Sequence, residues 1–231
     1  ITGTLNDPKV VGNFSYNLGM YNNDIVIQSI TGSYTYSNDM LLLQDVTLVS
    51  PGIRGHIDEG RISKDGQLDI KVSANHIDME DFRNKLPLPV TGFFDFEGQL
   101  TGNLKSPYFH GVIKSQNLSI RGEAFDEVTG NIDYYNHILF LKDMYMKQGD
   151  GKYTLQADYH INYQTLNGHV GIEKGDIRSM GVMAGWERNN ITGKINGDIN
   201  ISGTIDNPSI DMAAFVDEGK LGEYVLEDVA C

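Results

Sequence analysis

The sequence predicts an all-β protein: an elongated, curved sheet built from repeats, forming a solenoid-like trough with one short helical segment in each repeat. Three observations lead to this prediction. A motif containing glycine and proline occurs three times along the chain, as in repeat proteins. Apolar and polar residues alternate over most of the sequence, which is the period of a strand. The composition includes 26 Gly, 12 Tyr and 9 Phe but only 6 Pro.

The recurring motif is an aliphatic residue, a hydroxyl residue, Gly, any residue, an aliphatic residue, two polar residues and Pro. Its copies are residues 1–8, 100–107 and 201–208. Two further pairs of blocks match in the same register: 30–45 with 128–143, and 90–92 with 191–193. One matched glycine would be weak evidence, but several blocks in one register indicate a true internal repeat.

The repeat divides the chain into three units: residues 1–99, 100–200 and 201–231. The first unit lacks the strand that should precede its motif, and the third stops partway through its unit. We therefore expect both chain ends to be cuts through a longer array, in which each unit packs mainly on its neighbours.

Strands are predicted wherever the alternation is clear. The clearest case runs from Ile191 to Ile201, and the motif prolines are expected at strand starts, where a missing N–H is tolerated. Further strands are predicted at about 24–30, 40–49, 67–73, 138–146 and 153–163. Turn residues separate them at 22–24, 37–39, 64–66 and 167–168.

Each complete unit also contains one candidate helical segment. In the first, Asp78 is a plausible N-cap for a helix that extends to Leu86 and stops at Pro87. Asp176 to Trp186 occupies the same place in the second. We interpret these segments as hydrophobic plugs that pack on the sheet, with a gate or a partner-docking helix as the alternative.

One face of the predicted sheet is apolar and the other is polar, so one face must be covered while the other can be solvated. Glycines interleaved on the apolar face indicate strong curvature, or else a cramped core where two sheets meet. We expect the apolar set to line the trough, with the core of a closed sandwich as the alternative. The predicted lining residues are Phe14, Tyr16, Leu42, Val46, Phe94, Phe96, Ile113, Phe140, Met144, Ile195, Ile199, Ile201 and Met212.

Charge and composition exclude several classes of function. The net charge is −13, without a block rich in Lys and Arg, which argues against binding to nucleic acid. It also argues against electrostatic docking on anionic lipid headgroups. Cys231 is the single cysteine, so an internal disulfide and a cysteine metal cluster are both excluded.

The sequence contains no group of residues whose types and spacing are typical of a catalytic site. The six histidines form no His-x-x-x-His pair and have no carboxylate at ligand spacing, and His110 and His160 are expected on the solvated polar face. The string from Gly149 to Lys152 lacks the other features of a phosphate loop. We therefore expect neither an enzyme nor a resident metal or cofactor.

The motif, followed by an alternating strand and then by Ile/Val-x-Gly, resembles TamB and the wider AsmA-like family along the whole chain. This resemblance implies a curled trough called a β-taco, in a periplasmic protein anchored to the bacterial inner membrane by a segment outside this stretch. It implies phospholipid acyl chains as the cargo. It also implies a role in outer-membrane protein assembly with a barrel partner, through a C-terminal region outside this stretch.

The expected function is therefore to conduct phospholipids between the inner and outer membranes. Moving a two-chain lipid through water exposes roughly 30 methylenes, at a cost on the order of 20–25 kcal/mol, which a covered apolar path would largely remove. One alternative is a structural stalk or adhesin with a closed core and a binding outer face. A carbohydrate-active enzyme would need clustered carboxylates, and Asp95, Glu97 and Asp198 are too loosely placed.

Overall fold

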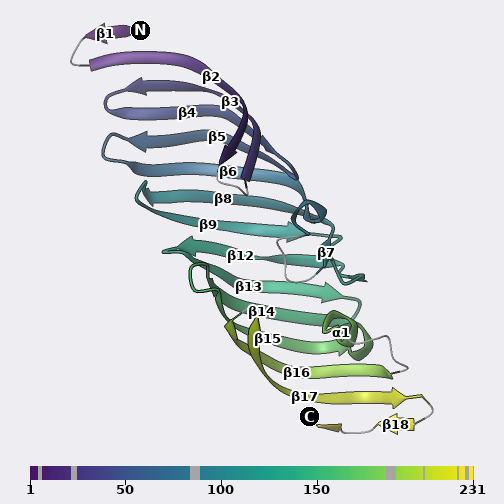
Figure 1. Cartoon of the computed structure of the whole chain (residues 1–231). Coiled ribbons are helices and arrows are strands. Elements are labelled where there is room, and N and C mark those ends of the chain that lie inside the picture. The colour runs from purple at the N-terminus through teal and green to yellow at the C-terminus, as the bar shows by residue number, and fades with distance from the viewer. Residues whose placement is uncertain are drawn as a thin grey trace.

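The chain is all-β, in a computed structural model that describes residues 1–4, 7–21, 25–83, 89–185, 191–204, 206–222, 224–226 and 229–230. A 16-stranded antiparallel sheet that does not close on itself forms most of the molecule (Figure 1). A separate three-stranded sheet and one short α-helix accompany it. None of the helices in these ranges is long and apolar enough to cross a membrane.

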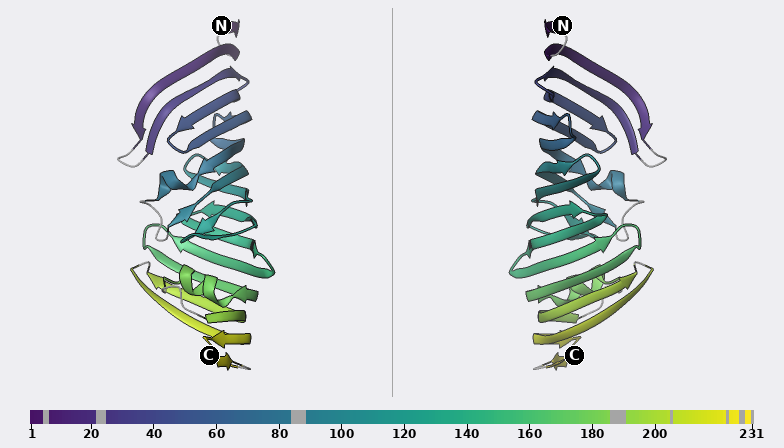
Figure 2. Two further views of the ribbon diagram at one scale, coloured as in Figure 1. Left: turned by 90° about the vertical axis from the view of Figure 1, so that its right-hand side faces the viewer. Right: turned by 90° about the vertical axis from the view of Figure 1, so that its left-hand side faces the viewer.

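The strands of the large sheet follow one another in chain order, so nearly every neighbour in the sheet is also the next strand in the sequence. Figure 2 shows these strands stacked successively from the N-terminus to the C-terminus and bending along their length. They are β1 Thr2–Thr4, β2 Asp7–Tyr21, β3 Ile25–Ser37, β4 Met40–Ser50, β5 Ile53–Ser63, β6 Gln67–Asp78, β8 Phe93–Asn103, β9 Ser106–Ser115, β12 Glu127–Tyr135, β13 Ile138–Gln148, β14 Gly151–His160, β15 Thr165–Asp176, β16 Ile191–Thr204, β17 Asn207–Leu221, β18 Tyr224–Leu226 and β19 Val229–Ala230.

Each copy of the recurring motif forms the same hairpin. In all three, the motif glycine is the cross-strand partner of the motif proline: Gly3 with Pro8, Gly102 with Pro107, and Gly203 with Pro208. Gly102 has a φ of +83°, a conformation that residues with a Cβ rarely adopt. The proline is the second residue of β2, β9 and β17, so the prediction that these prolines lie at strand starts is confirmed.

The predicted turns have mixed outcomes. Residues 37–39 join β3 to β4 and residues 64–66 join β5 to β6, as expected, whereas residues 22–24 lie outside the described residues. The turn predicted at Asn167–Gly168 is wrong, because both residues lie inside β15 and the chain reverses earlier, between β14 and β15. Asn167 instead donates a hydrogen bond to Asp158 on the neighbouring strand, at 3.1 Å.

Several strands contain a β-bulge, where two residues of one strand stand opposite a single residue of its neighbour. The bulges in β4, β6, β13 and β15 contain Asp45, His76, Asp143 and Lys174, each with a φ between 48° and 60°. A bulge N–H is satisfied by a side chain in two of them: His76 N–H donates to Asp95 at 2.9 Å, and Lys174 N–H donates to Asn196 at 2.8 Å. These bulges reset which side chains point to each face.

The two candidate helical segments differ in the structure. In the first unit, Asp78 caps a single 3-10 turn, η1 Met79–Phe82, and the predicted continuation to Leu86 and Pro87 lies outside the described residues. In the second, Asp176 caps α1 Ile177–Met183 by accepting a hydrogen bond from Ser179 N–H at 2.9 Å. Trp186, the predicted end of that helix, is also outside the described residues.

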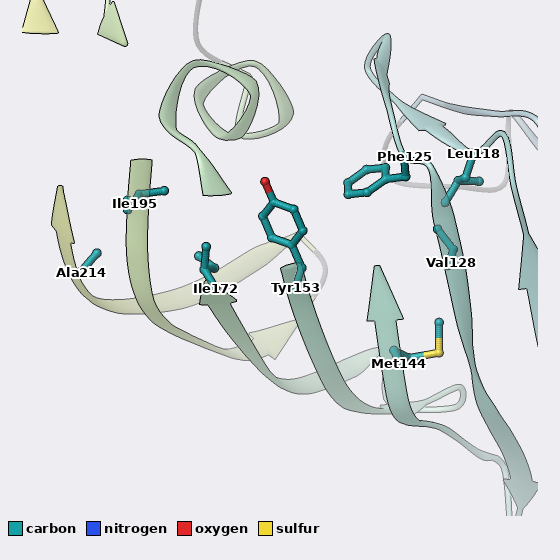
Figure 3. Close-up of a cluster of buried hydrophobic side chains, with 8 residues drawn as sticks. All are labelled: Leu118, Phe125, Val128, Met144, Tyr153, Ile172, Ile195 and Ala214. Carbon is teal, nitrogen blue, oxygen red and sulfur yellow. The ribbon is translucent and has the colours of Figure 1, made fainter. Parts of the chain in front are cut away.

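A cluster of buried apolar side chains lies near one end of the strands, between the sheet on one side and α1 and residues 118–125 on the other. Met144, Tyr153, Ile172 and Ile195 rise from successive strands toward α1 and toward the stretch that carries Leu118 and Phe125 (Figure 3). Ile177, Met180 and Met183 of α1 pack against the same cluster. That stretch also contains β10 Ser119–Ile120 and β11 Glu123–Ala124, which form the three-stranded sheet together with β7 Val90–Thr91. Together, α1 and this stretch cover the apolar face at that end.

Gly92 is required where β7 leads into β8. It has a φ of +106°, and a Cβ at this position would lie 2.3 Å from the carbonyl oxygen of Asn117. We expect Gly92→Ala to lower the free energy of unfolding by about 3 kcal/mol, because backbone strain and a backbone clash add. Gly122 is the matched control, because its φ is +84° but no atom would lie within 4 Å of a Cβ added there.

Gly122→Ala should therefore cost only the strain, about 1 kcal/mol. Urea unfolding followed by circular dichroism measures both variants. If the two variants lose the same free energy of unfolding, the backbone of Asn117 does not approach Gly92 as closely as it does in the structure.

Candidate apolar groove

The register of the sheet places eleven of the thirteen predicted lining residues on one face. Cross-strand pairs establish this directly, for example Phe14 with Gly32, Phe96 with Ile113, and Ile201 with Ile210. The eleven are Phe14, Tyr16, Val46, Phe94, Phe96, Ile113, Met144, Ile195, Ile199, Ile201 and Met212. This surface is called the apolar face below.

Leu42 and Phe140 were also predicted to line the groove, and for these two the prediction is wrong. Leu42 stands opposite Thr35 and Arg61, and Phe140 stands opposite Asp133 and Asp158, all on the other face. Strict alternation would put Leu42 with Val46, and Phe140 with Met144. The bulges at Asp45 and Asp143 insert one residue between them and so reverse the faces.

The apolar face is divided between a covered strip and an open strip. The covered strip consists of Met144, Tyr153, Ile172 and Ile195, which lie under α1 and its neighbours and are 3–6% exposed. Val46 is also buried, at 2%. The open strip lies toward the opposite ends of these strands and continues onto β8, β9 and β12, outside the buried cluster, and its residues are half-buried. It consists of Leu100, Phe109, Tyr134, Leu139, Tyr159, Leu166 and Ile201.

The open strip is continuous from strand to strand. Leu100 pairs with Phe109, Phe109 with Tyr134, Tyr134 with Leu139, Leu139 with Tyr159, and Tyr159 with Leu166. Neighbouring strands lie about 4.8 Å apart, so these six side chains form an apolar row about 24 Å long. At the two edges of the sheet, Tyr16 and Met212 are 54% and 46% exposed.

Two hollows lie over the polar face. One, of about 620 Å³, is lined by side chains that include Phe140, Gln156 and His169, and the other, of about 470 Å³, by Lys71, Glu97 and His110 among others. Both are open to solvent. The polar face is therefore hollowed as well as charged. A stalk or adhesin that binds a ligand on its outer face would use this surface.

A buried carboxylate on the polar face was missed in the sequence. Asp133 is 4% exposed, accepts a hydrogen bond from Lys142 Nζ at 2.6 Å and is hydrogen-bonded to Nδ1 of His110. Burial raises the pKa of the Asp133 carboxyl, but the hydrogen bonds from Lys142 and His110 outweigh it, so the pKa lies below its ordinary value. Partial burial and the nearby Asp133 carboxylate raise the pKa of Tyr108.

The two histidines expected on the solvated face differ in their surroundings. His110 lies on the polar face as expected, with its side chain 53% exposed, and it is also hydrogen-bonded to Asp133 of the neighbouring strand. The ring of His160 lies against that of Tyr163 with 4.3 Å between centroids, and its Nδ1 atom is buried without a hydrogen-bond partner in the described part of the chain. Asp133 lies on another strand than His110, and Tyr163 meets His160 in the turn after β14, so alternation along a strand predicts neither environment.

The described residues contain no group of three His, Cys, Asp or Glu side chains that could hold a metal ion. The carboxylates considered for glycan hydrolysis are far apart in the sheet: Asp95 and Glu97 lie on β8, whereas Asp198 lies on β16. Asp198 instead lies 3.2 Å from His169 on the neighbouring strand, as an exposed pair.

These features define a class, an open all-β sheet protein with one partly covered apolar face. Comparisons with protein-family models, with curated proteins and with solved structures find no match.

Proposed function

We propose that this chain is a segment of a TamB/AsmA-like protein of the periplasm, anchored to the inner membrane, whose apolar face conducts phospholipids between the two membranes. The observation that supports the proposal is the continuous open strip, an apolar surface on an unclosed sheet whose residues are half-buried and are not covered by α1 and its neighbours. Acyl chains are the cargo that fits such a surface, because their burial is driven by area and needs no catalytic group.

The proposal includes an elongated, curved architecture of three repeat units, 1–99, 100–200 and 201–231, with a short helical segment in each complete unit. Corresponding structural features support it, since they recur 98 residues apart. Asp45 and Asp143 occupy equivalent bulges, His76 and Lys174 do likewise, and Asp78 and Asp176 cap the helical segments.

The burial pattern narrows the lipid path to the open strip. Val46, Met144 and Ile195 are too deeply covered to touch a passing acyl chain unless the cover moves, and they act as ordinary core. Phe109, Tyr159 and Ile201 are the better candidates for contact. Tyrosines suit the border of such a path, because the ring can lie against acyl chains while the hydroxyl remains in water.

A charge placed in the open strip should weaken lipid binding. We expect Ile201→Asp to weaken binding of a solvatochromic lipid probe by at least tenfold, because a carboxylate in contact with an acyl chain loses its hydration. The measurement is probe fluorescence against protein concentration, followed by lipid transfer between donor and acceptor vesicles. Ser202→Asp is the matched control, since Ser202 is the next residue of β16 and lies exposed on the polar face.

Ser202→Asp should bind the probe as the unaltered chain does. Equal binding by all three proteins would contradict a path along the open strip.

A structural stalk or adhesin is the second candidate, favoured by the buried cluster under α1 and by the hollows of the polar face. In that case the apolar face is only a core, and the chain should give no probe signal at any concentration. A role in outer-membrane protein assembly with a barrel partner also belongs to this proposal, and co-purification of the full-length protein with a barrel would test it.

A further inference from the structure

A row of side chains crosses the middle of the polar face from strand to strand. Its members are cross-strand partners in turn: Gln99, His110, Asp133, Phe140, Asp158 and Asn167. We call these six residues the polar row. They belong to β8, β9, β12, β13, β14 and β15, which are interior strands of the large sheet. Neighbouring strands lie about 4.8 Å apart, so the polar row is about 24 Å long.

The two hollows of the polar face lie along this row. The hollow of about 620 Å³ is lined by its last three members, and the hollow of about 470 Å³ by its first two. Asp133 lies between the two hollows and is 4% exposed. A long, narrow ligand that follows the row therefore meets a recess on each side of Asp133.

Hydrogen bonds within the polar face hold the amide side chains of the row in place. Asn167 Nδ2 donates to Asp158 at 3.1 Å, and Gln99 Nε2 donates to Asp69 at 2.6 Å. An amide group has two N–H donors and an acceptor oxygen, so each amide keeps capacity for a ligand after this one bond. Donors and acceptors that are already held in place suit a ligand rich in hydroxyl groups, because less side-chain entropy is lost on binding.

Phe140 places a half-buried aromatic ring in the row, with a carboxylate opposite it on each neighbouring strand, Asp133 and Asp158. Lys142 Nζ lies 5.4 Å from the centroid of this ring and 2.6 Å from Asp133, so the ring lies beside a carboxylate whose charge is balanced. The residue at the same place in the matched block 30–45 is Leu42, so the strand does not require an aromatic side chain there. An aromatic ring offers a flat surface on which the C–H face of a sugar ring can pack, while the sugar hydroxyls reach the polar neighbours.

The spacing and charge of the row distinguish between extended ligands. One sugar of a straight glycan spans about the same length as one strand spacing of about 4.8 Å. The side chains on one side of an extended peptide recur about every 6.8 Å, so they fall out of step with the strands. A peptide that adds as a strand needs a sheet edge, which the row does not offer. A polyanion is disfavoured by the net charge of −13.

We infer that the polar row binds a straight, neutral oligosaccharide of the cellulose or chitin type. One sugar packs on Phe140, and its neighbours along the chain form hydrogen bonds with side chains of the row on successive strands. The inference goes beyond lipid conduction and does not depend on it, because the polar row and the open strip lie on opposite faces of the sheet.

Titration calorimetry of the full chain with hexasaccharides tests the inference. We expect cellohexaose or chitohexaose to bind, and the corresponding disaccharide to bind about tenfold more weakly, because it reaches fewer strands. Maltohexaose is the control, since it carries the same hydroxyl groups as cellohexaose on a chain that coils, and it should not bind. Absence of binding by both straight hexamers at millimolar concentration overturns the inference, and so does equal binding of maltohexaose.

Two variants locate the bound sugar. Phe140→Leu should weaken binding of the hexamer about tenfold, because the aromatic ring is lost. Phe96→Leu is the matched control, since Phe96 is also half-buried but lies on the apolar face, and it should bind as the unaltered chain does. Asn167→Ala should weaken binding about fivefold, whereas Thr154→Ala should not, because Thr154 is exposed on the same face and lines neither hollow.

Binding that both Phe140→Leu and Asn167→Ala leave unchanged would place the sugar elsewhere and overturn the inference. A loss in Phe96→Leu as large as the loss in Phe140→Leu would also overturn it. Asn167→Ala keeps the test decisive if Phe140→Leu does not fold, because Asn167 is exposed.

Discussion

Replacing Asp133 by alanine is expected to lower the free energy of unfolding by about 3 kcal/mol, because a buried carboxylate loses its charge-assisted hydrogen bonds and leaves a gap in the sheet surface. The side chain lies between β9 and β13, where Lys142 Nζ is 2.6 Å away and His110 is also bonded to it. Urea unfolding at pH 7, followed by circular dichroism, measures the loss.

Asp158→Ala is the matched control for this prediction. Asp158 lies on the same face of the sheet and accepts a hydrogen bond from Asn167 at 3.1 Å, but it is less buried and has no basic partner among the residues that the structure describes. We expect its loss to cost less than about 1 kcal/mol. Similar losses in the two variants would show that Asp133 has no special role in joining β9, β12 and β13.

The pH dependence follows from the lowered pKa of Asp133. A carboxyl whose folded pKa lies below the unfolded value of 3.8 contributes its stability above that value and loses it as pH falls through the folded pKa. Lys142→Met removes the hydrogen bond and the charge of Lys142 while burial remains, so the pKa of Asp133 should rise from its lowered value. Protonation of Asp133 should then cost that variant less stability than it costs the unaltered chain. The difference between their unfolding midpoints should therefore narrow as pH is lowered from about 5 toward 3.

Lys152→Met is the control that shows what the loss of an exposed lysine does to the pH dependence of stability. Lys152 forms an exposed pair with Glu173 at 3.5 Å, so the stability of Lys152→Met should depend on pH as that of the unaltered chain does. If the unfolding midpoints of Lys142→Met and Lys152→Met fall in parallel as pH is lowered, Asp133 is not the carboxyl whose pairing with Lys142 sets the pH dependence of stability.

Local periodicity in the sequence was sufficient to predict the fold class and most of the apolar face. Phe94 and Phe96, or Ile195 and Ile199, are separated by an even number of residues within an uninterrupted stretch of strand, so alternation places them correctly. Leu42 and Phe140 fail because a bulge intervenes. The sequence did indicate these bulges, because the matched blocks end at an aspartate in both units, Asp45 and Asp143. Aspartate adopts a positive φ more readily than most residues do.

The rest depended on long-range pairing that a single sequence does not contain. Asp133 meets Lys142 and His110 only because β12 lies between β9 and β13 in a particular register. The cover over the apolar face is another example. Leu118 and Phe125 lie in a stretch without strong periodicity, and nothing local indicates that they pack against Tyr153 and α1. The division between a covered and an open strip therefore emerged only from the structure.

Replacing Tyr153 by alanine is the direct test of that division and is expected to cost about 3–5 kcal/mol of unfolding free energy. The side chain is 3% exposed, meets Phe125 edge-to-face with 5.7 Å between ring centroids, and donates a hydrogen bond to Gln148 at 3.3 Å. Its removal leaves a cavity bounded by strands on one side and by the cover on the other, which can collapse only if the cover moves.

Tyr159→Ala is the matched control, because Tyr159 lies on the same strand and the same face but in the open strip, opposite Leu139 and Leu166. Solvent or lipid can fill the space that it leaves, so we expect a loss of about 1 kcal/mol. The lipid probe should respond in the opposite order, weakening with Tyr159→Ala while Tyr153→Ala binds as before at a temperature where it remains folded. Equal destabilisation with unchanged probe binding would mean that both ends of the strands are ordinary core, and that the apolar face has no open path.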